Sequence, residues 1–467
     1  MKLQDLFTKL QIDPAFNYEV TSVETDSRKV GPTSIFVAIR GSHVDSHDQV
    51  YLEEAYEKGC RVFILEEEKT LPEDAVIFVV ANTRKTLGLV ASSLYGHPTK
   101  QLKIIGVTGT KGKTSTSFIL KQLLEGCGMK TLLIGTSGIF MGKNHFESSN
   151  TTPDPLVIQK LLREAADGGV QYVIMEVSSQ AMKQFRVFGC RFMASVFTNL
   201  SEDHIGPMEH ENFQEYMQCK KHFLMLGKKV IANKDDPYFE EITSDLKKPI
   251  LTVGHGDADF LVRDGEDFFL NQYPIETNLK GSFNRMNLSL ALATLNEIGF
   301  SMERLLPHTK NLHIPGRLET YTWNNRTFVI DYAHNKMSLS SLLQEIETWN
   351  PKAIRLVVGS VGDRTFERRK EIPEAAAPYV DALYLTSDNP GMEDPQKILD
   401  EMKSHSTVEP TYTIVDRREA ILKMAKESEE GEVLVISGKG DETYQLIGKE
   451  RVPYSDASVV QYIQEHL

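Results

Sequence analysis

A glycine-rich loop between an apolar strand and a helix constrains this chain more than any other stretch. Residues 102–107 are apolar enough for a buried strand, and residues 116–124 carry apolar side chains at helical spacing. Between them, residues 109–114 read Gly-Thr-Lys-Gly-Lys-Thr. The backbone N–H groups of such a loop, and the helix N-terminus after it, attract phosphate. The pattern predicts nucleotide binding, with Lys113 on the β- and γ-phosphates and the Thr114 hydroxyl on Mg²⁺.

Length and charge limit the classes of protein that remain. The 467 residues predict about three domains at roughly 150 residues each. A net charge of −13 argues against nonspecific binding to nucleic acid or to an anionic membrane. The four cysteines are scattered and are typical of reduced thiols in the cytosol. Residues 1–6 begin an amphipathic helix without a signal-peptide core, and no apolar run reaches the ~18 residues of a membrane span. We expect a cytoplasmic protein.

Apolar runs alternate with helical segments along the whole chain, which predicts an α/β protein. Apolar runs of this kind are typical of buried parallel strands. A helix is expected at 49–58, and Gly96 to Thr99 is expected to be a linker. The predicted strands are 34–39, 61–65, 76–80, 102–107, 131–134, 172–175, 195–198, 229–232, 328–330, 355–359, 382–386 and 433–436.

Polar residues directly follow many of these strands. Glu176 follows one, residues 199–204 another, and residues 331–334 a third. Ligands of open α/β sheets bind outside the carboxyl ends of the strands. The same arrangement recurs in the last third of the chain, at 387–390 and 437–440. It predicts a second doubly wound domain that faces the nucleotide-binding one.

Short motifs along nearly the whole chain occur in the order known from one enzyme family. Residues 106–114 read Gly-Val-Thr-Gly-Thr-Lys-Gly-Lys-Thr, with Lys111 where that family usually has Asn. The chain thereby resembles the Mur ligases, the ATP-dependent amide-forming enzymes of peptidoglycan precursor synthesis. The further matching motifs are Asp26-Ser27-Arg28-Lys29-Val30, Thr151-Thr152-Pro153, Glu176-Val177-Ser178-Ser179, Thr198-Asn199-Leu200-Ser201-Glu202-Asp203-His204, Pro315-Gly316-Arg317, Asp331-Tyr332-Ala333-His334, Asp388-Asn389-Pro390 and Gly438-Lys439-Gly440.

The resemblance implies a three-domain α/β architecture and an activity. Residues 1–100 would bind the UDP-sugar, 101–317 would hold ATP on a P-loop parallel sheet, and 318–467 would form a Rossmann-like amino-acid domain. The N-terminal Asp-Ser-Arg, the Thr-Thr-Pro and the Asp-Asn-Pro most resemble the branch that adds the third residue to UDP-MurNAc-L-Ala-D-Glu. The D-Glu γ-carboxylate would attack the γ-phosphate of ATP, and the incoming amine would attack the resulting acyl phosphate. A monomer is expected.

The resemblance also implies the ATP and metal residues. Two Mg²⁺ ions are expected, one on Thr114 and one on Glu176 and His204, although oxygen ligands suit Mg²⁺ better than His does. Lys220 ends a Tyr-x-x-x-Lys pattern and is favoured over Lys221 as a lysine carbamylated by CO₂ that orients the metal. The implied catalytic residues are Lys113, Glu176, His204 and Lys220. The implied ATP contacts are Gly109, Thr110, Lys111, Gly112, Lys113, Thr114, Ser115, Asn284, Asn287, Arg317, Asp331 and His334.

Two segments match the family's contacts to the UDP-MurNAc-peptide. Arg186 suits this role because a guanidinium grips a carboxylate or phosphate with two parallel hydrogen bonds. Gln180 stands where the family commonly has His, and a neutral amide cannot exchange a proton at pH 7. The implied residues are Ser27, Gly41, Asp45 and His47 at the uridine end, and Thr151, Thr152, Ser178, Gln184 and Arg186 at the muramoyl-peptide end.

The amino-acid pocket departs from the diaminopimelate-adding members. Those enzymes follow Asp-Asn-Pro with an Arg that pairs the distal carboxylate, and this chain has Gly391 there. Asp441 likewise replaces their His. Losing these cationic residues and gaining a carboxylate favours a substrate with a distal ammonium. L-lysine is the best guess, and ornithine is nearly as suitable. The expected contacts are Asp388, Asn389, Asp441 and Glu442.

Three other functions stay open at this point. The chain could be a paralogue that acts on another precursor, or a folylpolyglutamate-type ligase, which the Asp-Ser-Arg element argues against. It could also be a catalytically silent partner subunit, which the intact Lys113, Thr114, Glu176, His204 and Lys220 argue against.

Overall fold

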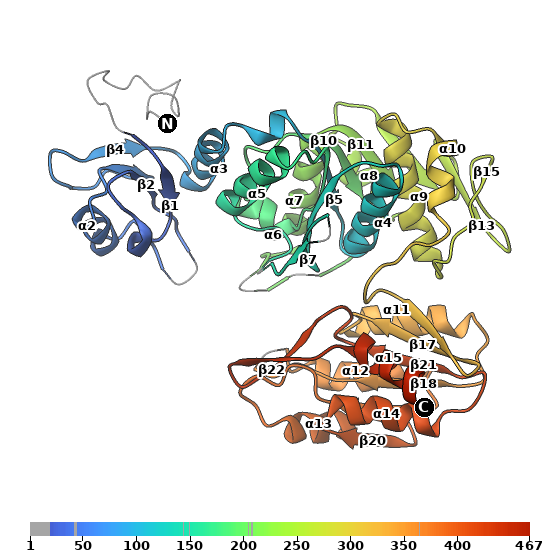
Figure 1. Ribbon diagram of the computed structural model, residues 1–467. Helices are drawn as coiled ribbons and strands as arrows, with labels where there is room; N and C mark the ends of the chain where they lie inside the picture. The colour runs from blue at the N-terminus through green and yellow to red at the C-terminus, as the bar shows by residue number, and fades with distance from the viewer. Residues whose placement is uncertain are drawn as a thin grey trace. The chain divides into compact units, whose positions relative to one another are not determined.

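The computed structural model describes residues 19–41, 44–142, 144–148, 150–203, 205–206, 209–363 and 365–467. The predicted N-terminal helix at residues 1–6 therefore lies outside the described residues. Two compact units are formed. The first comprises the chain through Asn278 together with Arg285–Asn311, and the second comprises Leu279–Asn284 together with Leu312–Leu467. Each unit is described here by itself (Figure 1).

The N-terminal part of the first unit is a parallel sheet in the order β1-β2-β3-β4. Alternate residues of β2 face opposite sides, so Ile35 and Val37 pack under α3 while Phe36 packs under α2. The elements are β1 (Ser22–Glu24), β2 (Ser34–Val37), β3 (Val62–Leu65), β4 (Val76–Val79), α2 (Gln49–Glu57), α3 (Thr83–Leu94) and the 3₁₀ turns Ser27–Lys29 and Pro98–Lys100.

The rest of the first unit is built on one large sheet, in which the described residues contribute eleven strands in the order β15-β14-β13-β12-β11-β10-β5-β9-β6-β7-β8. Its strands are β5 (Lys103–Thr108), β6 (Thr131–Gly135), β7 (Gly138–Met141), β8 (Asn144–Phe146), β9 (Tyr172–Glu176), β10 (Phe192–Phe197), β11 (Gly227–Asn233), β12 (Ile250–Gly254), β13 (Phe260–Asp264), β14 (Phe268–Leu270) and β15 (Tyr273–Pro274). Its helices are α4 (Lys113–Gly126), α5 (Pro155–Asp167), α6 (Ser179–Lys183), α7 (Phe213–Leu226), α8 (Phe239–Thr243), α9 (Ser282–Glu297) and α10 (Met302–Leu305), followed by a 3₁₀ turn at Leu306–His308.

The central strand β5 lies between β9 and β10, while the chain runs from β5 through α4 to β6, two positions away. Such a reversal of strand order is where α/β sheets open a crevice at the carboxyl ends of their strands. The loop after β5, the end of β9 and the segment after β10 therefore meet at one edge.

The second unit is an α/β sandwich around a sheet whose described strands run β16-β17-β21-β18-β19-β20. Along β21, Val433 and Val435 face α11, α12 and α13, whereas Leu434 and Ile436 face α14 and α15. Its elements are β16 (Glu319–Trp323), β17 (Arg326–Asp331), β18 (Ile354–Val358), β19 (Ala382–Thr386), β20 (Thr411–Ile414), β21 (Val433–Ser437), the hairpin β22 (Tyr444–Ile447) and β23 (Glu450–Pro453), α11 (Lys336–Glu347), α12 (Arg368–Ala376), α13 (Pro395–Ser404), α14 (Arg417–Glu427) and α15 (Asp456–His466).

The α/β class and every predicted strand are confirmed, with ends that shift by a few residues. Helix α4 begins at Lys113 rather than at Thr116, because the glycine loop runs directly into the first turn. The expected linker at Gly96–Thr99 is an ordered turn in which Pro98 and Thr99 are buried. The sheets are not purely parallel: β7, β8, β14, β15 and β16 pair antiparallel.

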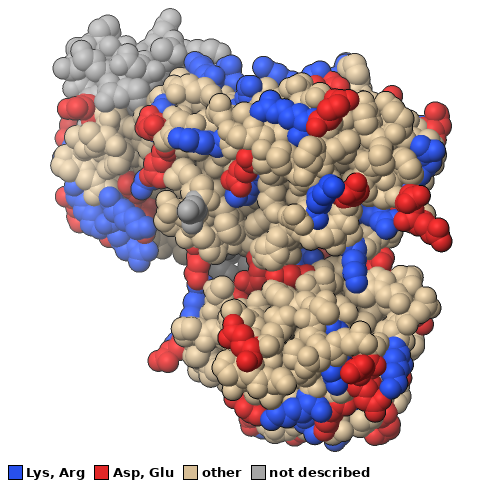
Figure 2. All heavy atoms as spheres, turned by 45° about the vertical axis from the view of Figure 1, so that its right-hand side comes forward, with Lys and Arg blue, Asp and Glu red and all other residues tan. Residues whose placement is uncertain are grey.

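Lysine and arginine side chains are interspersed with aspartate and glutamate on the face shown in Figure 2. A mixed surface of this kind carries no extended field of one sign. Within the part of the chain that the structure describes, every helix is too short or too polar to cross a membrane.

A histidine bridge beside the large sheet predicts a pH-dependent stability. His255 lies 2.6 Å (Nδ1) from Asp235 and 2.9 Å (Nε2) from Asp264. Burial lowers the pKa of His255, but hydrogen bonds and charge from both carboxylates outweigh it, so the pKa is raised above 6.5. The stability that protonated His255 contributes is fully present below about pH 6.5, and it is lost as the pH rises through the folded-state pKa. We expect His255→Gln to lower the free energy of unfolding by less than about 1 kcal/mol at pH 6, since the ring is half exposed.

Urea denaturation at pH 6 and at pH 9 measures this effect. The difference between wild type and His255→Gln should shrink at pH 9, while exposed His466→Gln at the end of α15 should show no such trend. An equal difference at both pH values would contradict the prediction.

Candidate active site

The glycine-rich loop after β5 is held in place by the segment after β10. Gly109 has φ +151°, and a Cβ there would lie 1.8 Å from Thr198 Oγ1, so this position admits only glycine. Thr198 Oγ1 donates to the Lys111 carbonyl at 2.6 Å, and the Asn199 side chain both accepts from the Lys111 N–H (2.9 Å) and donates to its carbonyl (3.0 Å). The first half of the Thr-Asn-Leu-Ser-Glu-Asp-His motif thus shapes the phosphate loop.

Two lysines converge on this loop. Lys113, the first residue of α4, donates to the carbonyls of Gly109 (2.9 Å) and Thr110 (3.0 Å). Lys220 on α7 donates to the Gly109 carbonyl at 2.8 Å and is only 1% exposed. Burial and the positive charge of Lys113 lower the pKa of Lys220 well below its ordinary range, which makes this amine easier to deprotonate than an exposed lysine. Lys221 points elsewhere, to Asp245 and the end of α8.

A buried carboxylate lies beside the first turn of α4. Glu176, at the end of β9, is fully buried and accepts from the hydroxyls of Thr114 (3.0 Å) and Thr136 (3.1 Å). The Thr136 N–H also donates to it at 3.2 Å. The predicted pair of magnesium ligands, Thr114 and Glu176, is therefore brought together from positions 62 residues apart in the sequence. His204, the third predicted ligand, lies outside the described residues.

A cavity of about 300 Å³ opens beside the two lysines. Six of the predicted site residues line it, from both the phosphate end and the muramoyl-peptide end of the site. The lining residues are Lys113, Asn150, Thr151, Ser178, Ser179, Gln180, Gln184, Arg186, Glu209, Tyr216 and Lys220.

The predicted muramoyl-peptide residues form one hydrogen-bonded group. Thr152 Oγ1 donates to the Glu176 carbonyl (2.8 Å) and accepts from the Ser178 N–H (3.1 Å). Arg186 donates to the Thr152 carbonyl at 2.8 Å, and its Nε and second terminal nitrogen both donate to Gln184 Oε1. Thr151 shares a 3.0 Å hydroxyl contact with Thr136. The group connects the metal-side carboxylate to the cavity.

The predicted uridine-end residues follow the first two strands of the N-terminal sheet. Asp45 accepts from the backbone N–H of His47 (3.0 Å) and lies 2.7 Å from its Nδ1. The Gly41 N–H donates to the Val44 carbonyl, which closes the loop after β2. Ser27, after β1, donates to Glu54 on α2 at 2.5 Å. Because β1 and β2 are parallel neighbours, both segments lie at the same edge of the sheet.

The two asparagines of α9 have different surroundings. Asn287 Oδ1 accepts from Thr116 at 3.3 Å and lies against Gly112 of the phosphate loop. Asn284 belongs to the second unit, where its Nδ2 donates to the Lys280 carbonyl at 3.0 Å. Its Oδ1 is buried without a hydrogen-bond partner among the described residues.

Arg317, Asp331 and His334 gather in the second unit. Asp331, at the end of β17, accepts from the backbone N–H groups of Leu318 (2.7 Å) and Ala333 (2.8 Å), so it is a loop cap. Arg317 lies 4.3 Å from the centre of the Tyr332 ring. His334 Nδ1 lies 2.8 Å from the Tyr332 carbonyl, and burial lowers the pKa of His334.

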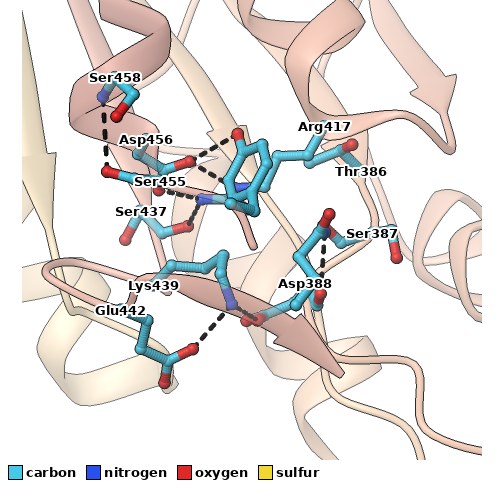
Figure 3. A network of polar contacts seen from close by, with 12 residues as sticks. Thr386, Ser387, Asp388, Arg417, Ser437, Lys439, Glu442, Ser455, Asp456 and Ser458 are labelled. Carbon is cyan, nitrogen blue, oxygen red and sulfur yellow. Dashed lines mark hydrogen bonds and ion pairs between the residues drawn. The ribbon is translucent and has the colours of Figure 1, made fainter. Parts of the chain in front are cut away.

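The acids predicted for the amino-acid pocket are engaged with cations of the same unit (Figure 3). Buried Lys439 lies 2.7 Å from Glu442 and 3.5 Å from Asp388. Asn389 accepts from Lys439 at 3.1 Å and donates to Glu442 at 3.1 Å. Asp441 lies 3.3 Å from Arg317, a longer ion pair. These predicted amino-acid contacts are thus already partnered within their own unit.

A fully buried ion pair lies beside this network. Arg417, the first residue of α14, donates through Nε and one terminal nitrogen to Asp456 at 2.8 Å each. The same terminal nitrogen donates to the Ser437 carbonyl at 3.0 Å, one residue before Gly438 and Lys439. The bidentate pair thus ties α14 and α15 to the end of β21 (Figure 3). Nothing in the sequence pattern marked this pair.

Several residues that line or support the cavity were not among the predicted site residues, although Tyr216 begins the Tyr-x-x-x-Lys pattern that ends at Lys220. Tyr216 lies one helical turn before Lys220, its hydroxyl is 3.0 Å from that of Thr110, and its ring lies 4.3 Å from the Lys220 ammonium. The i, i+4 spacing of Tyr216 and Lys220 on one helix was a usable signal. Thr136 and Glu209 gave none, because single polar residues after a strand or in a loop are common.

Three family models match successive parts of the chain. Residues 19–94 match the Mur ligase family catalytic domain, residues 107–295 the Mur ligase middle domain, and residues 316–440 the Mur ligase glutamate ligase domain. The similar relatives include the UDP-N-acetylmuramoyl-L-alanyl-D-glutamate--2,6-diaminopimelate ligases of Geobacillus thermodenitrificans and Clostridium tetani. The first is 37% identical, covering 98% of each chain, and the second is 33% identical, covering 100% of each.

A solved structure of a protein with the same name has a TM-score of 0.73 and 28% identity, and each chain covers 100% of the other. The family matches span most of the chain, and the relatives align along nearly its full length. The fold, the phosphate loop and the comparisons agree: this chain is an enzyme of the Mur ligase family of ATP-dependent ligases.

Proposed function

We propose that this enzyme adds the third residue of the peptidoglycan stem peptide, L-lysine, to the D-Glu γ-carboxylate of UDP-MurNAc-L-Ala-D-Glu at the expense of ATP. The main support for this proposal is that one cavity is lined both by Lys113 of the phosphate loop and by Arg186 and Gln184. One wall can hold a γ-phosphate and the other a carboxylate. The names of the relatives support the UDP-linked dipeptide as the acceptor.

The chemistry requires two anions to meet. In the first step a γ-carboxylate oxygen attacks the γ-phosphorus, the bond to the bridging oxygen of ADP breaks, and an acyl phosphate forms. In the second step the amine attacks the acyl carbon, phosphate leaves, and the amine loses a proton. Phosphoryl transfer depends mainly on positioning and charge stabilisation. Lys113 neutralises the phosphates, while Arg186 orients the substrate's anionic end.

The donor set beside the loop fits Mg²⁺. The Thr114 hydroxyl and the buried Glu176 carboxylate are hard oxygen donors 3.0 Å apart at the mouth of the phosphate loop. We propose Thr114 for one ion and Glu176, with His204, for a second. When bound, Mg²⁺ would screen the repulsion between the carboxylate and the triphosphate.

Lys220 is proposed to carry a carbamate. Its Nζ would form a bond to the carbon of CO₂ and release one proton, which requires a neutral amine. The Lys220 amine is buried and donates to the Gly109 carbonyl of the phosphate loop, which supports this proposal. A carbamate there would give the phosphate loop an anion beside Lys113 that can orient a metal ion.

The chain's three parts are proposed to divide the substrates. Residues 1–100 would bind the uridine end through Ser27, Gly41, Asp45 and His47, residues 101–317 would bind ATP, and residues 318–467 the amino acid. Asn284 and Asn287 are proposed for the adenine side, and Arg317, Asp331 and His334 for the γ-phosphate and ribose. Arg317 would then exchange its long ion pair with Asp441 for the phosphate.

Position 391 supports lysine rather than diaminopimelate. Gly391 has φ +60°, and a Cβ there would lie 2.0 Å from the Asp363 carboxylate, which accepts the Met392 N–H at 2.9 Å. The backbone is fixed by hydrogen bonds to the β22–β23 hairpin, from Gly391 to Leu446 and from Gly448 to Gly391. A carboxylate therefore lies against position 391, where the diaminopimelate-adding enzymes carry Arg.

Arg369, on α12, does not reverse this charge. Arg369 donates to both oxygens of Glu393 (2.9 and 2.8 Å) and to Glu401 (2.8 Å), so its charge is already matched. A distal ammonium is attracted by Asp363, whereas a distal carboxylate is repelled by it. The relatives' names point to diaminopimelate, and this local charge reversal points to a monocarboxylate with a terminal amine.

We expect L-lysine to be used at least about tenfold more efficiently than meso-diaminopimelate, because like charges placed together at a binding site are costly. ADP release with UDP-MurNAc-L-Ala-D-Glu, ATP and one amino acid at a time measures kcat/KM for each. Asp363→Asn keeps the acceptor for the Met392 N–H and should lower kcat/KM for lysine roughly three- to tenfold.

Asp400→Asn on α13 is the matched control, since it removes the same charge from an exposed position. Equal efficiency with diaminopimelate and lysine would overturn the pocket argument, and efficient use of ornithine alone would replace lysine as the substrate. No ADP release with any amino acid would favour a silent partner subunit instead.

A further inference from the structure

The proposed acceptor carries a diphosphate between its two ends, and the residues so far assigned include no cation for it. Asp45 and His47 stand at the uridine end, and Arg186 stands at the muramoyl-peptide end. A diphosphate bears two negative charges, and proteins usually match such groups with Arg, Lys or helix N-termini. This inference rests on the proposed UDP-linked substrate and asks which side chain meets its diphosphate.

Arg84 lies in the first turn of α3 and reaches the uridine-end loop. Its terminal nitrogen donates to the Arg40 carbonyl at 2.7 Å. Arg40 begins the loop that carries Gly41, Asp45 and His47, and it pairs with Asp45 across that loop in an isolated β-bridge. The guanidinium of Arg84 is thus attached to the loop proposed to hold the uridine.

The same helical turn contacts the segment that carries Arg186. The ammonium of Lys85, the next residue, lies 4.6 Å from the centre of the Phe185 ring. Helix α3 also packs against α5, which begins at Pro155 after Asp154. Asp154 itself lies 3.6 Å from Arg186. The first turn of α3 therefore spans from the uridine loop to the muramoyl-peptide group.

Arg84 is a half-buried cation without a close carboxylate partner among the described residues. None of the described residues places a carboxylate within 4 Å of it, whereas Arg40 nearby has Asp45, Glu66 and Glu67. Burial lowers the pKa of Arg84, and the positive charge of Arg186 lowers it further, against a partial offset from Asp154 and Glu66. Two guanidinium groups that repel one another favour an anion between them.

We propose that Arg84 binds the diphosphate of the UDP-linked acceptor, between the uridine loop and Arg186. Its planar fork can give two parallel hydrogen bonds to phosphate oxygens while one N–H stays on the Arg40 carbonyl. Arg84 is a binding residue and takes no part in phosphoryl transfer at the phosphate loop.

Steady-state kinetics of Arg84→Ala tests this assignment. KM for UDP-MurNAc-L-Ala-D-Glu should rise about 10- to 100-fold, as expected for lost charge-assisted hydrogen bonds, while kcat and KM for ATP change less than about twofold. Arg84→Lys should recover part of the loss because it keeps the charge without the fork. Lys85→Ala removes the same charge from the same turn and should leave KM for the acceptor within about twofold.

Inhibition by fragments separates the diphosphate from the rest of the acceptor. The inhibition constant of UDP should rise about 10-fold or more in Arg84→Ala, while that of uridine, which has no phosphate, should not change. Equal inhibition of wild type and Arg84→Ala by UDP would overturn the role of Arg84 while the UDP-linked substrate stands. If UDP fails to inhibit the wild-type enzyme, the UDP-linked substrate fails, and this inference fails with it.

Discussion

Lys113→Ala should abolish turnover, a loss of roughly 10³-fold or more in kcat, because it removes the only charge that α4 brings to the phosphate loop in its first turn. The side chain already lies on the loop, donating to the carbonyls of Gly109 and Thr110. Bound phosphates would draw it a short distance into the cavity that it lines. ADP release in the presence of UDP-MurNAc-L-Ala-D-Glu and lysine measures the loss.

The matched control removes an exposed lysine outside the loop. Lys130→Ala, four residues after the end of α4, should retain turnover within about twofold. Thermal unfolding should show that Lys113→Ala is folded, since its backbone position in α4 does not depend on the ammonium. Turnover of Lys113→Ala within tenfold of wild type would contradict the role given to the phosphate loop.

The strand-loop-helix unit around Lys113 was predictable because its signals are local. An apolar run, two glycines and helical spacing all fall within 25 residues, and the structure has β5, the loop and α4 in that order. The meeting of Thr114 with Glu176 also followed, since carboxyl ends of neighbouring parallel strands share one edge of a sheet.

The antiparallel additions to the sheets were not predictable in the same way. Strand β7 is only four residues long, and strand β8 is three exposed residues without an apolar run. Strands β13, β14 and β15 are likewise short and lie at the other end of the sheet order. Patterns of hydrophobicity carry little information about such edges.

Charge pairing among the residues proposed for the amino-acid substrate was equally hidden. The residue types predicted acids at Asp388, Asp441 and Glu442, but not that Lys439 and Arg317 would already hold them. Asp363, which fills the space at position 391, comes from a loop 28 residues earlier and carries no motif that marks it. Local sequence identifies candidate groups, and the tertiary fold decides which of them are matched.

Lys220→Ala should also abolish turnover, by roughly 10³-fold or more, and short carboxylic acids such as acetate or propionate should restore part of it, about tenfold or more. The mutation opens a space beside the Gly109 carbonyl, where Lys220 is buried, and a small carboxylate can enter it in place of the proposed carbamate. Lys113→Ala should not respond to the same acids, because it lacks a cation rather than an anion. ADP release against acid concentration measures the rescue.

The neighbouring lysine supplies the matched control for this rescue. Lys221→Ala removes an equally buried ammonium from the next position of α7, but one that pairs with Asp245 and Ser244 away from the cavity. It should lower stability while leaving kcat within about twofold, and acids should not affect it. If acids fail to restore Lys220→Ala while primary amines succeed, Lys220 acts as a cation and the carbamate is wrong. If Lys221→Ala is the inactive variant, the assignment of the reactive lysine moves by one residue.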